Sequence, residues 1–271
     1  MYQKILVPVV VPANVEPLVR LAAHLLDPGG EIHVLNIITA NSMPEVAKGW
    51  RNSLHVVIPA HETAAALDVQ VVPEVAVARD VPVEILEKAE TLGAHAILMT
   101  LSGDRKKRRR FLGHISTAIL NHAACDVVIV NPLALSGGKL GKLILPTFTV
   151  QPPAKAMAAA EALSSNLGNI PIVTLHMLES KGKPLGPSTD HEFRGRQGKI
   201  PRQLKTVLFP ARLFHSTRLL PSAIVDEIRK EGFGMCIIGQ EGRGHGDQFI
   251  SRAFLEELFA ISPFPIVVLR A

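Results

Sequence analysis

The chain has 271 residues, of which 47% are apolar, 20% are charged and only 4% are aromatic, with two cysteines and a net charge of +5. These values are typical of compact globular modules and exclude a disulfide-stapled scaffold, and the two unpaired cysteines favour a reducing compartment. Because no apolar stretch reaches the ~18–20 residues of a membrane span and the N-terminus does not read as a signal peptide, we expect a cytoplasmic protein that does not span a membrane.

In the first half, short runs rich in β-branched residues alternate with amphipathic segments. The pattern predicts strands at 4–11, 31–39, 67–78, 94–100 and 126–131, and helices at 14–26, 80–93 and 113–124. Asp80 is the expected N-cap of the second helix and Gly93 its end. The stretch between the second and third strands shows no regular period. Such alternation predicts a mostly parallel sheet with helices on both faces.

The second half repeats this order. It predicts strands at 142–148, 170–178, 205–211, 235–239 and 265–270, and helices at 152–166, 221–232 and 250–261, while the Gly/Pro-rich basic segment 181–205 is expected to be a long loop. KILVPV, AILMTLSG and DVVIVN align with KLILPT, MCIIGQEG and PIVVLR at an offset of 138–139 residues. We therefore predict two copies of one α/β module, at residues 1–133 and 140–271, joined by a linker at 134–139.

The loop after the fourth strand of each module carries the most informative chemistry. In an open parallel sheet, ligands bind beyond the carboxyl ends of the strands where the strand order reverses. Here the first loop runs from Gly103 through nine residues to Gly113-His114, and the second has Gly239 and Gly242, nine residues, then Arg252-Ala253. Glycines let backbone amides approach an anion, and the following helix N-terminus offers unpaired N–H groups.

These motifs, in this order and twice over, resemble the universal stress protein family, specifically its tandem members. The resemblance implies two tandem Rossmann-like α/β domains, each a mostly parallel five-stranded sheet with helices on both faces, and a G-x-x-G, nine residues, G-S/T loop that binds an adenine nucleotide. Carried onto this chain, it predicts contacts to ATP, ADP or AMP from Val9, Val10, Gly103, Gly113, His114, Ile115 and Ser116, and in the second half from Gly239, Gly242, Ser251 and Arg252.

Several positions depart from the family pattern. Nucleotide-binding members usually carry an Asp just after the first strand, where this chain has Val10 and, in the second half, Phe148. Thr100 replaces the first loop glycine, and His114 stands where a Ser or Thr would donate to phosphate. We therefore predict a degenerate, weak nucleotide site and a regulatory role in sensing or signalling. The alternative is an interaction domain that binds no nucleotide and regulates a partner such as a membrane transporter.

Six consecutive cations at 105–110 border the predicted site. Arg105–Arg110 could contact phosphates or an acidic surface of an unknown protein partner, or they could form a solvated loop that binds nothing. Only Phe111 is an adjacent aromatic residue, which argues against specific nucleic-acid binding. We also expect the closing strands of the two modules to pack as an intramolecular pseudo-dimer. Formation of a homodimer is left open.

The sequence offers little for catalysis. The eleven histidines are scattered without metal-ligand spacing, so we predict no metal site, and Cys125 and Cys236 read as small core residues. Acidic residues fall mainly on the solvent faces of helices, and no nucleophile has a base beside it in the sequence. We expect no catalysis beyond slow ATP hydrolysis.

Overall fold

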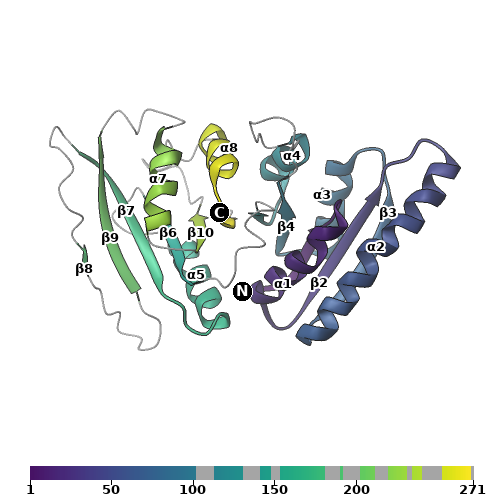
Figure 1. The fold of residues 1–271 in the computed structure, drawn as a ribbon, viewed down its shortest axis with the longest axis horizontal. Helices are drawn as coiled ribbons and strands as arrows, with labels where there is room; N and C mark the ends of the chain where they lie inside the picture. The colour runs from purple at the N-terminus through teal and green to yellow at the C-terminus, as the bar shows by residue number, and fades with distance from the viewer. Residues whose placement is uncertain are drawn as a thin grey trace. The chain divides into compact units, whose positions relative to one another are not determined.

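A parallel sheet of five strands organises the first half of the chain in the computed structural model of the protein (Figure 1). Its order is β3-β2-β1-β4-β5, with strands β1 (Tyr2–Pro8), β2 (Leu26–Ile38), β3 (Gln70–Val77), β4 (Ala96–Thr100) and β5 (Asp126–Val130). The structure describes residues 1–101, 113–130, 141–147, 153–180, 190–191, 202–210, 219–230, 234–239 and 252–269.

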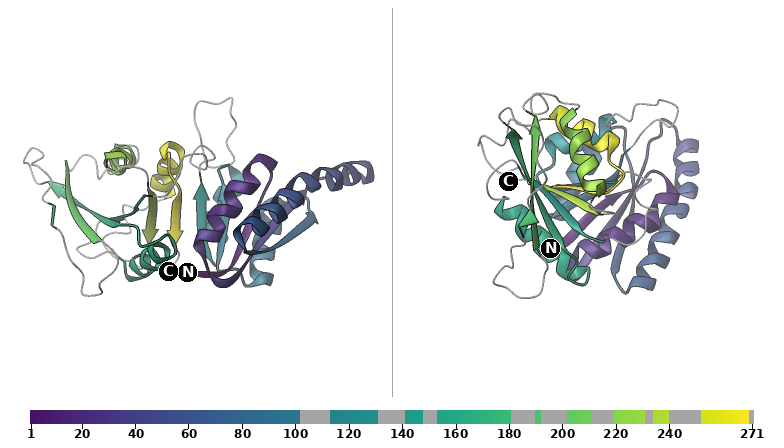
Figure 2. Two further views of the ribbon diagram at one scale, coloured as in Figure 1. Left: turned by 60° about the horizontal axis from the view of Figure 1, so that its bottom comes forward. Right: turned by 60° about the vertical axis from the view of Figure 1, so that its left-hand side comes forward.

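Helices cover both faces of this sheet. A single 3-10 turn, η1 (Pro12–Asn14), leads into α1 (Val15–Leu25), which packs beside α2 (Met43–Leu67) on one face. The other face carries α3 (Val81–Leu92) and α4 (His114–His122), which contact each other. Figure 2 shows α2 as the long helix that runs along the β3 edge of this unit.

The second half forms a sheet of the same topology. Its order is β11-β10-β6-β7-β9-β8, with parallel strands β6 (Leu143–Thr147), β7 (Ile172–Ser180), β9 (Arg202–Pro210), β10 (Met235–Gly239) and β11 (Ile266–Leu269), and a short antiparallel strand β8 (Asp190–His191). Its described helices are α5 (Ala154–Asn166), α7 (Leu219–Lys230) and α8 (Arg252–Ile261).

The two sheets confirm the prediction of two tandem Rossmann-like α/β modules. Apart from β8, each strand of the second unit takes the place of one strand of the first, so that β6 corresponds to β1 and β10 to β4. The chain divides into two compact units, the first from residues 1–102 and 112–136 and the second mainly from residues 137–271. In each unit the strand order reverses beside the first strand, between β1 and β4 or between β6 and β10.

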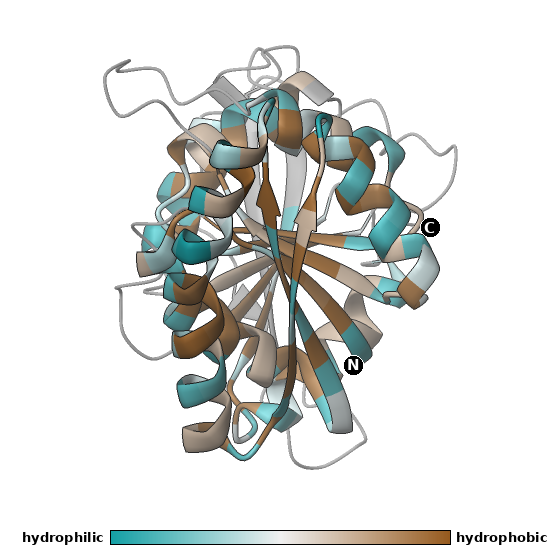
Figure 3. Ribbon diagram, turned by 90° about the vertical axis from the view of Figure 1, so that its right-hand side faces the viewer, coloured by the Kyte–Doolittle hydropathy of each residue, from teal (hydrophilic) through white to brown (hydrophobic). Residues whose placement is uncertain are grey.

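Aliphatic strands form the core of each unit. Ile5, Leu6 and Val7 of the central strand are fully buried, as are Leu143 and Ile144 in the second unit. Figure 3 shows the same pattern, with strands that are largely brown and helices that alternate between brown and teal. Burial on both faces explains why these strands are continuous apolar runs without polar alternation.

Helix α2 is the main element that sequence periodicity did not reveal. It spans 25 residues where the sequence shows no regular period, because Gly49 and Pro59 interrupt the pattern. Both residue types disfavour a helix interior. Gly49 has a packing role, since a Cβ atom there would lie 2.4 Å from Cγ2 of the buried Ile38 at the end of β2. The missing side chain lets α2 lie close against the sheet.

Other boundaries follow the expectations closely. Asp80 caps α3 by accepting a hydrogen bond from the Val83 N–H at 3.2 Å, and Gly93 ends that helix with φ of 60°, as predicted. Strand β2 begins earlier than expected, at Leu26, because this residue pairs with Tyr2 of β1. Residues 190–191 and 202–205 lie in strands, so the prediction of an uninterrupted loop over 181–205 was wrong there.

We expect Gly49→Ala to destabilise the first unit. Helix propensity alone would favour alanine by about 1 kcal/mol, but forcing a Cβ atom against Ile38 costs roughly 1–3 kcal/mol. Trp50 is the chain's one tryptophan, so its fluorescence during urea unfolding reports on this unit. Asn52→Ala, at an exposed position of the same helix, is the control and should be neutral or slightly stabilising. A Gly49→Ala variant as stable as this control would contradict the packing role.

Candidate functional site

The first unit places Val9 and Val10 where β1 ends, beside the reversal of strand order. Val9 is buried and still held by β2, since its N–H donates to the Leu35 carbonyl oxygen at 2.8 Å and its carbonyl oxygen accepts from Asn36 Nδ2 at 2.9 Å. The chain then turns outward, and the Val10 side chain is 75% exposed. An exposed valine therefore stands at the strand end where the family usually has a carboxylate.

Helix α4 carries the remaining described candidates of this unit. Gly113 is its N-cap residue and offers no side-chain cap, and His114, Ile115 and Ser116 form its first turn. His114 is exposed, Ile115 is partly exposed and Ser116 is fully buried. The first N–H groups of any α-helix lack partners within the helix and attract anions. The start of α4 can therefore receive a phosphate.

The Ser116 hydroxyl is the least expected feature of this site. Its Oγ atom is buried and has no hydrogen-bond partner among the described residues. Leaving a buried hydroxyl unpaired costs ~1–3 kcal/mol, so such groups are rare in folded proteins. A hydroxyl at the third position of a helix lies beside the unpaired N–H groups of that helix. A bound phosphate oxygen would give this hydroxyl an acceptor.

The second unit differs at the equivalent positions. Thr147 takes the place of Val9 and is buried, and His176, its partner in the register of β7, takes the place of Asn36. His176 Nε2 is buried without a partner among the described residues, and burial lowers the pKa of this imidazole. Gly239 ends β10, where a Cβ atom would lie 3.0 Å from Pro153 Cβ. Close packing against the start of α5 thus accounts for this glycine without a ligand.

The remaining candidates are divided between one helix start and the undescribed part of the chain. Arg252 is the first residue of α8. Gly103, Arg105–Arg110, Phe148, Gly242 and Ser251 lie outside the described residues. The predicted nucleotide contacts therefore stay predictions, as do the linker and the packing of the closing strands.

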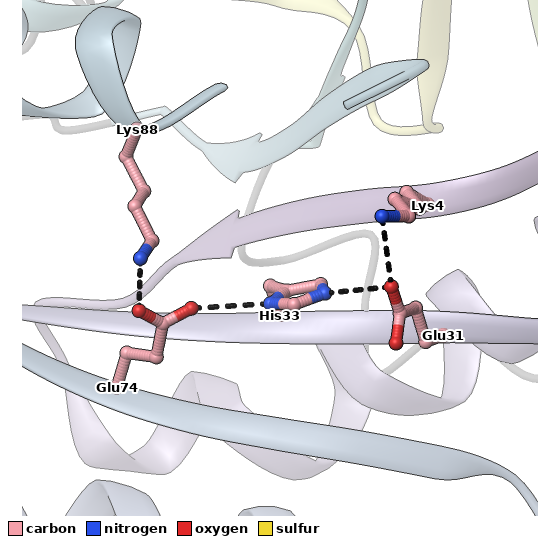
Figure 4. Close-up of polar contacts among 5 residues, drawn as sticks. All are labelled: Lys4, Glu31, His33, Glu74 and Lys88. Atoms are coloured by element: carbon pink, nitrogen blue, oxygen red, sulfur yellow. Dashed lines mark hydrogen bonds and ion pairs between the residues drawn. The ribbon is translucent and has the colours of Figure 1, made fainter. Parts of the chain in front are cut away.

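A separate polar cluster lies within the first unit, which we call the His33 cluster (Lys4, Glu31, His33, Glu74 and Lys88; Figure 4). His33 Nδ1 lies 3.1 Å from Glu74 Oε1, and because a carboxylate only accepts, this nitrogen carries the hydrogen of the bond. His33 Nε2 lies 3.2 Å from Glu31 Oε1, at ion-pair distance but without hydrogen-bond alignment. Lys4 Nζ approaches Glu31 at 3.3 Å, and Lys88 of α3 pairs with Glu74.

The carboxylates of this cluster are held in their ionised forms. The contact with His33 is the largest cause that lowers the pKa of Glu31, and Lys4 adds to it. For Glu74, desolvation is the largest single effect and acts to raise the pKa, but Lys88 and His33 together outweigh it and the pKa is lowered. The alternating positions Glu31 and His33 on one strand face were a sequence signal for this cluster. Sequence reasoning missed it because Lys4, Glu74 and Lys88 join it only through the sheet and α3.

The charges of the His33 cluster are paired with one another, so we assign the cluster a role in holding the fold together and not in binding a ligand. It links β1, β2, β3 and α3, and each carboxylate is already neutralised by a lysine.

Among the described residues, no three His, Cys, Asp or Glu side chains are grouped so that they could hold a metal ion. Within the same residues, no helix has the length and apolar character needed to cross a membrane.

Comparison with known proteins identifies the family of the first half. Residues 1–131 match the model of the universal stress protein family, so this part of the chain belongs to that family, as its motifs predict. No curated protein matches the sequence.

Solved structures share the fold over the whole chain. The chain is similar to a universal stress protein from Archaeoglobus fulgidus DSM 4304, at a TM-score of 0.65 and 16% identity over 98% of this chain and 96% of that one. For a putative universal stress protein from Pseudomonas aeruginosa UCBPP-PA14, the TM-score is 0.60 and the identity 13%, over 99% of this chain and 93% of that one. For the cytoplasmic domain of a prokaryotic cation chloride cotransporter, the TM-score is 0.54 and the identity 11%, over 100% of this chain and 96% of that one.

The lowered carboxylate pKa values predict how stability depends on pH. Because the pKa of Glu31 lies below its ordinary value of 4.5 only in the folded protein, its stabilising contribution is present above that value and is lost as the pH falls through the folded pKa. Glu31→Gln should therefore lower the free energy of unfolding at neutral pH, and the difference from wild type should shrink as the pH falls below roughly 4.

Urea unfolding monitored by Trp50 fluorescence at a series of pH values tests this expectation. Glu16→Gln is the matched control, because Glu16 pairs with Arg20 on the exposed surface of α1. Its effect should stay within ~0.5 kcal/mol at every pH. A Glu31→Gln effect of equal size at low and neutral pH would show that the carboxylate charge is not what stabilises the cluster.

Proposed function

We propose that this chain is a cytoplasmic regulatory protein of the universal stress type, whose first unit binds an adenine nucleotide weakly and hydrolyses it slowly at most. The site comprises the end of β1 and the first turn of α4, completed by the loop that joins β4 to α4. The observation that carries the proposal is the buried Ser116 hydroxyl, which has no partner among the described residues and sits at a helix N-terminus. We extend the same family assignment to the second unit because it repeats the topology of the first.

The phosphate end of the ligand would be held by α4. Backbone N–H groups of the first turn point toward an anion there, and Gly113 has no side chain to obstruct it. Ser116 Oγ would donate one more hydrogen bond to a phosphate oxygen. His114 is exposed at the same turn and could donate from its imidazole.

The adenosine end would be held poorly. At the end of β1 the exposed Val10 side chain can contact a base or sugar, but it cannot accept a hydrogen bond from the nucleoside. A polar group of the ligand that loses water without finding a partner weakens binding. We therefore expect a low affinity that depends mainly on phosphate, so that ATP and ADP bind better than AMP.

Calorimetric titration of the purified protein with ATP, ADP and AMP tests this site. Ser116→Ala should weaken binding at least ~10-fold, the contribution of one hydrogen bond to a charged group, and Gly113→Val should abolish it. Val10→Asp should strengthen binding about 10-fold by supplying the missing acceptor.

Val11→Asp is the control for the gained carboxylate. Val11 is the next residue and is also exposed, but it lies one position beyond the family's acidic residue. It should leave the affinity unchanged. Tight nucleotide binding that none of the Val10, Gly113 and Ser116 substitutions alters would contradict the placement of the site.

The second candidate function is an interaction domain without nucleotide. The exposed Val10 supports this function, and so does the fold that the chain shares with the cytoplasmic domain of a prokaryotic cation chloride cotransporter. In this alternative, Arg105–Arg110 would contact an acidic surface of the partner. Absence of nucleotide binding by both wild type and Val10→Asp would favour this function over the first.

The salt dependence of binding tests whether Arg105–Arg110 contact an anionic partner, whichever of the two functions holds. Binding of inorganic polyphosphate or polyglutamate should weaken steeply with ionic strength, because exposed charges are screened within ~8 Å at physiological salt. Converting Arg108, Arg109 and Arg110 together to Gln should flatten this dependence and leave the melting temperature nearly unchanged. A lower melting temperature with intact probe binding would mean that the run stabilises its own unit.

A further inference from the structure

Helix α2 exposes an apolar stripe on the side away from the sheet. The face that packs inward is buried at Ser53, Val56, Ala60, Thr63 and Ala64. Outside this face, Met43 is 79% exposed, Trp50 50%, Leu54 53% and Ile58 50%. Four of the eight exposed large hydrophobic side chains of the described residues thus lie on one helix. We call these four residues the α2 seam.

The spacing of the α2 seam makes it one continuous surface. Its members are separated by seven, four and four residues, which places them on one face over successive helical turns. At about half exposure or more, four large side chains leave on the order of 400 Å² of apolar surface in water. Patches of this size on a soluble protein often mark an interaction site.

The order of side chains along the α2 seam fits a second copy of itself. Leu54 lies at the centre, and Trp50 and Ile58 each lie four residues away on either side. If two α2 helices pair antiparallel about a two-fold axis at Leu54, Trp50 meets the partner subunit's Ile58. The same contact occurs again on the other side of the axis, as in an isologous interface. A flat bulky ring then packs against a β-branched side chain twice.

Charges beside the α2 seam select the antiparallel direction. Lys48 and Arg51 lie N-terminal to Leu54 on the exposed surface, and Glu62 lies C-terminal to it. On the helical wheel these three residues occupy the same flank of the seam. Antiparallel pairing brings Lys48 within about two residues, or ~3 Å along the axis, of the partner subunit's Glu62. In a parallel pair the two-fold axis would run along the helices and would place the charged flanks on opposite sides, so that these charges would not meet.

The charge balance argues against a lipid surface as the occupant. Helix α2 carries two acidic residues, Glu45 and Glu62, against Lys48 and Arg51. Helices that lie on anionic membranes are instead rich in Lys and Arg on the polar face. The α2 seam is therefore matched to its own copy better than to a membrane.

From these observations we propose that two copies of this chain associate through α2, antiparallel and with Leu54 on the two-fold axis. Two seams and their flanks bury on the order of 1,000 Å², at the low end for specific interfaces. The dimer is therefore weak and depends on protein concentration. This interface is separate from the closing strands and from the nucleotide site, and the proposal does not rest on the proposed function.

Sedimentation of the full chain over a wide concentration range tests the proposal. We expect a monomer–dimer equilibrium, and Leu54→Glu should raise its dissociation constant at least ~10-fold. Val83→Glu, which alters an exposed valine on α3, is the control and should leave the constant unchanged. Circular dichroism of each variant verifies that the chain still folds.

Charge reversal tests the direction of pairing. Lys48→Glu and Glu62→Lys should each weaken the dimer several-fold, and the double variant should recover wild-type association. Leu54→Cys should form a disulfide-linked dimer under mild oxidation, because the two-fold axis brings the two copies of this position together.

Four outcomes would overturn the proposal. The first is a monomer at every concentration, and the second is a dimer that neither Leu54→Glu nor Lys48→Glu affects. The third is a loss of thermal stability in the Leu54→Glu monomer, which would mean that the α2 seam is covered within one chain. The fourth is a blue shift of Trp50 fluorescence on addition of phosphatidylserine vesicles, which would make a lipid surface the occupant.

Discussion

The burial of β1 on both of its faces is the constraint on which the first unit depends. This strand lies between β2 and β4, and its residues Ile5, Leu6 and Val7 have no exposed surface. An unpaired charge at such a position would be costly, so these three positions can carry only apolar side chains. Polar side chains lie at the start of the strand, as Lys4 does, and polar chemistry becomes possible again where the strand ends. The residue after Val9 can therefore change from a carboxylate to a valine without affecting the fold.

The His33 cluster shows how the same sheet accommodates charge. Its members approach from three strands and one helix, and every carboxylate meets both His33 and a lysine. Paired charges of this kind contribute little net stability compared with an apolar core, but a missing partner is costly. The cluster therefore stabilises one register of β1, β2 and β3 beneath α3, since a shift by one residue would turn these side chains to the opposite face.

Sequence patterns predicted the architecture better than the site. The apolar runs and the internal repeat predicted the two modules, and Asp80 and Gly93 predicted the limits of α3. These features could be predicted because each depends on residues that are close together in the chain. Helix α2 was not predicted because the glycine at position 49 is required by packing against Ile38, a residue of strand β2. The His33 cluster and the buried, unpartnered Ser116 hydroxyl likewise depend on neighbours that are distant in the chain. Periodicity reports the face a residue occupies, and it carries no information about which groups meet there.

The buried position of Cys236 makes its reaction with alkylating reagents a measure of local opening in the second unit. The side chain is fully buried in β10, neither it nor Cys125 forms a disulfide, and burial raises the pKa of the Cys236 thiol. Thiolates, not thiols, react with alkylating reagents. In the native protein this sulfur is therefore protected both sterically and chemically, while the partly exposed Cys125 belongs to the first unit. The rate at which Cys236 becomes alkylated thus measures how often the strands around it open.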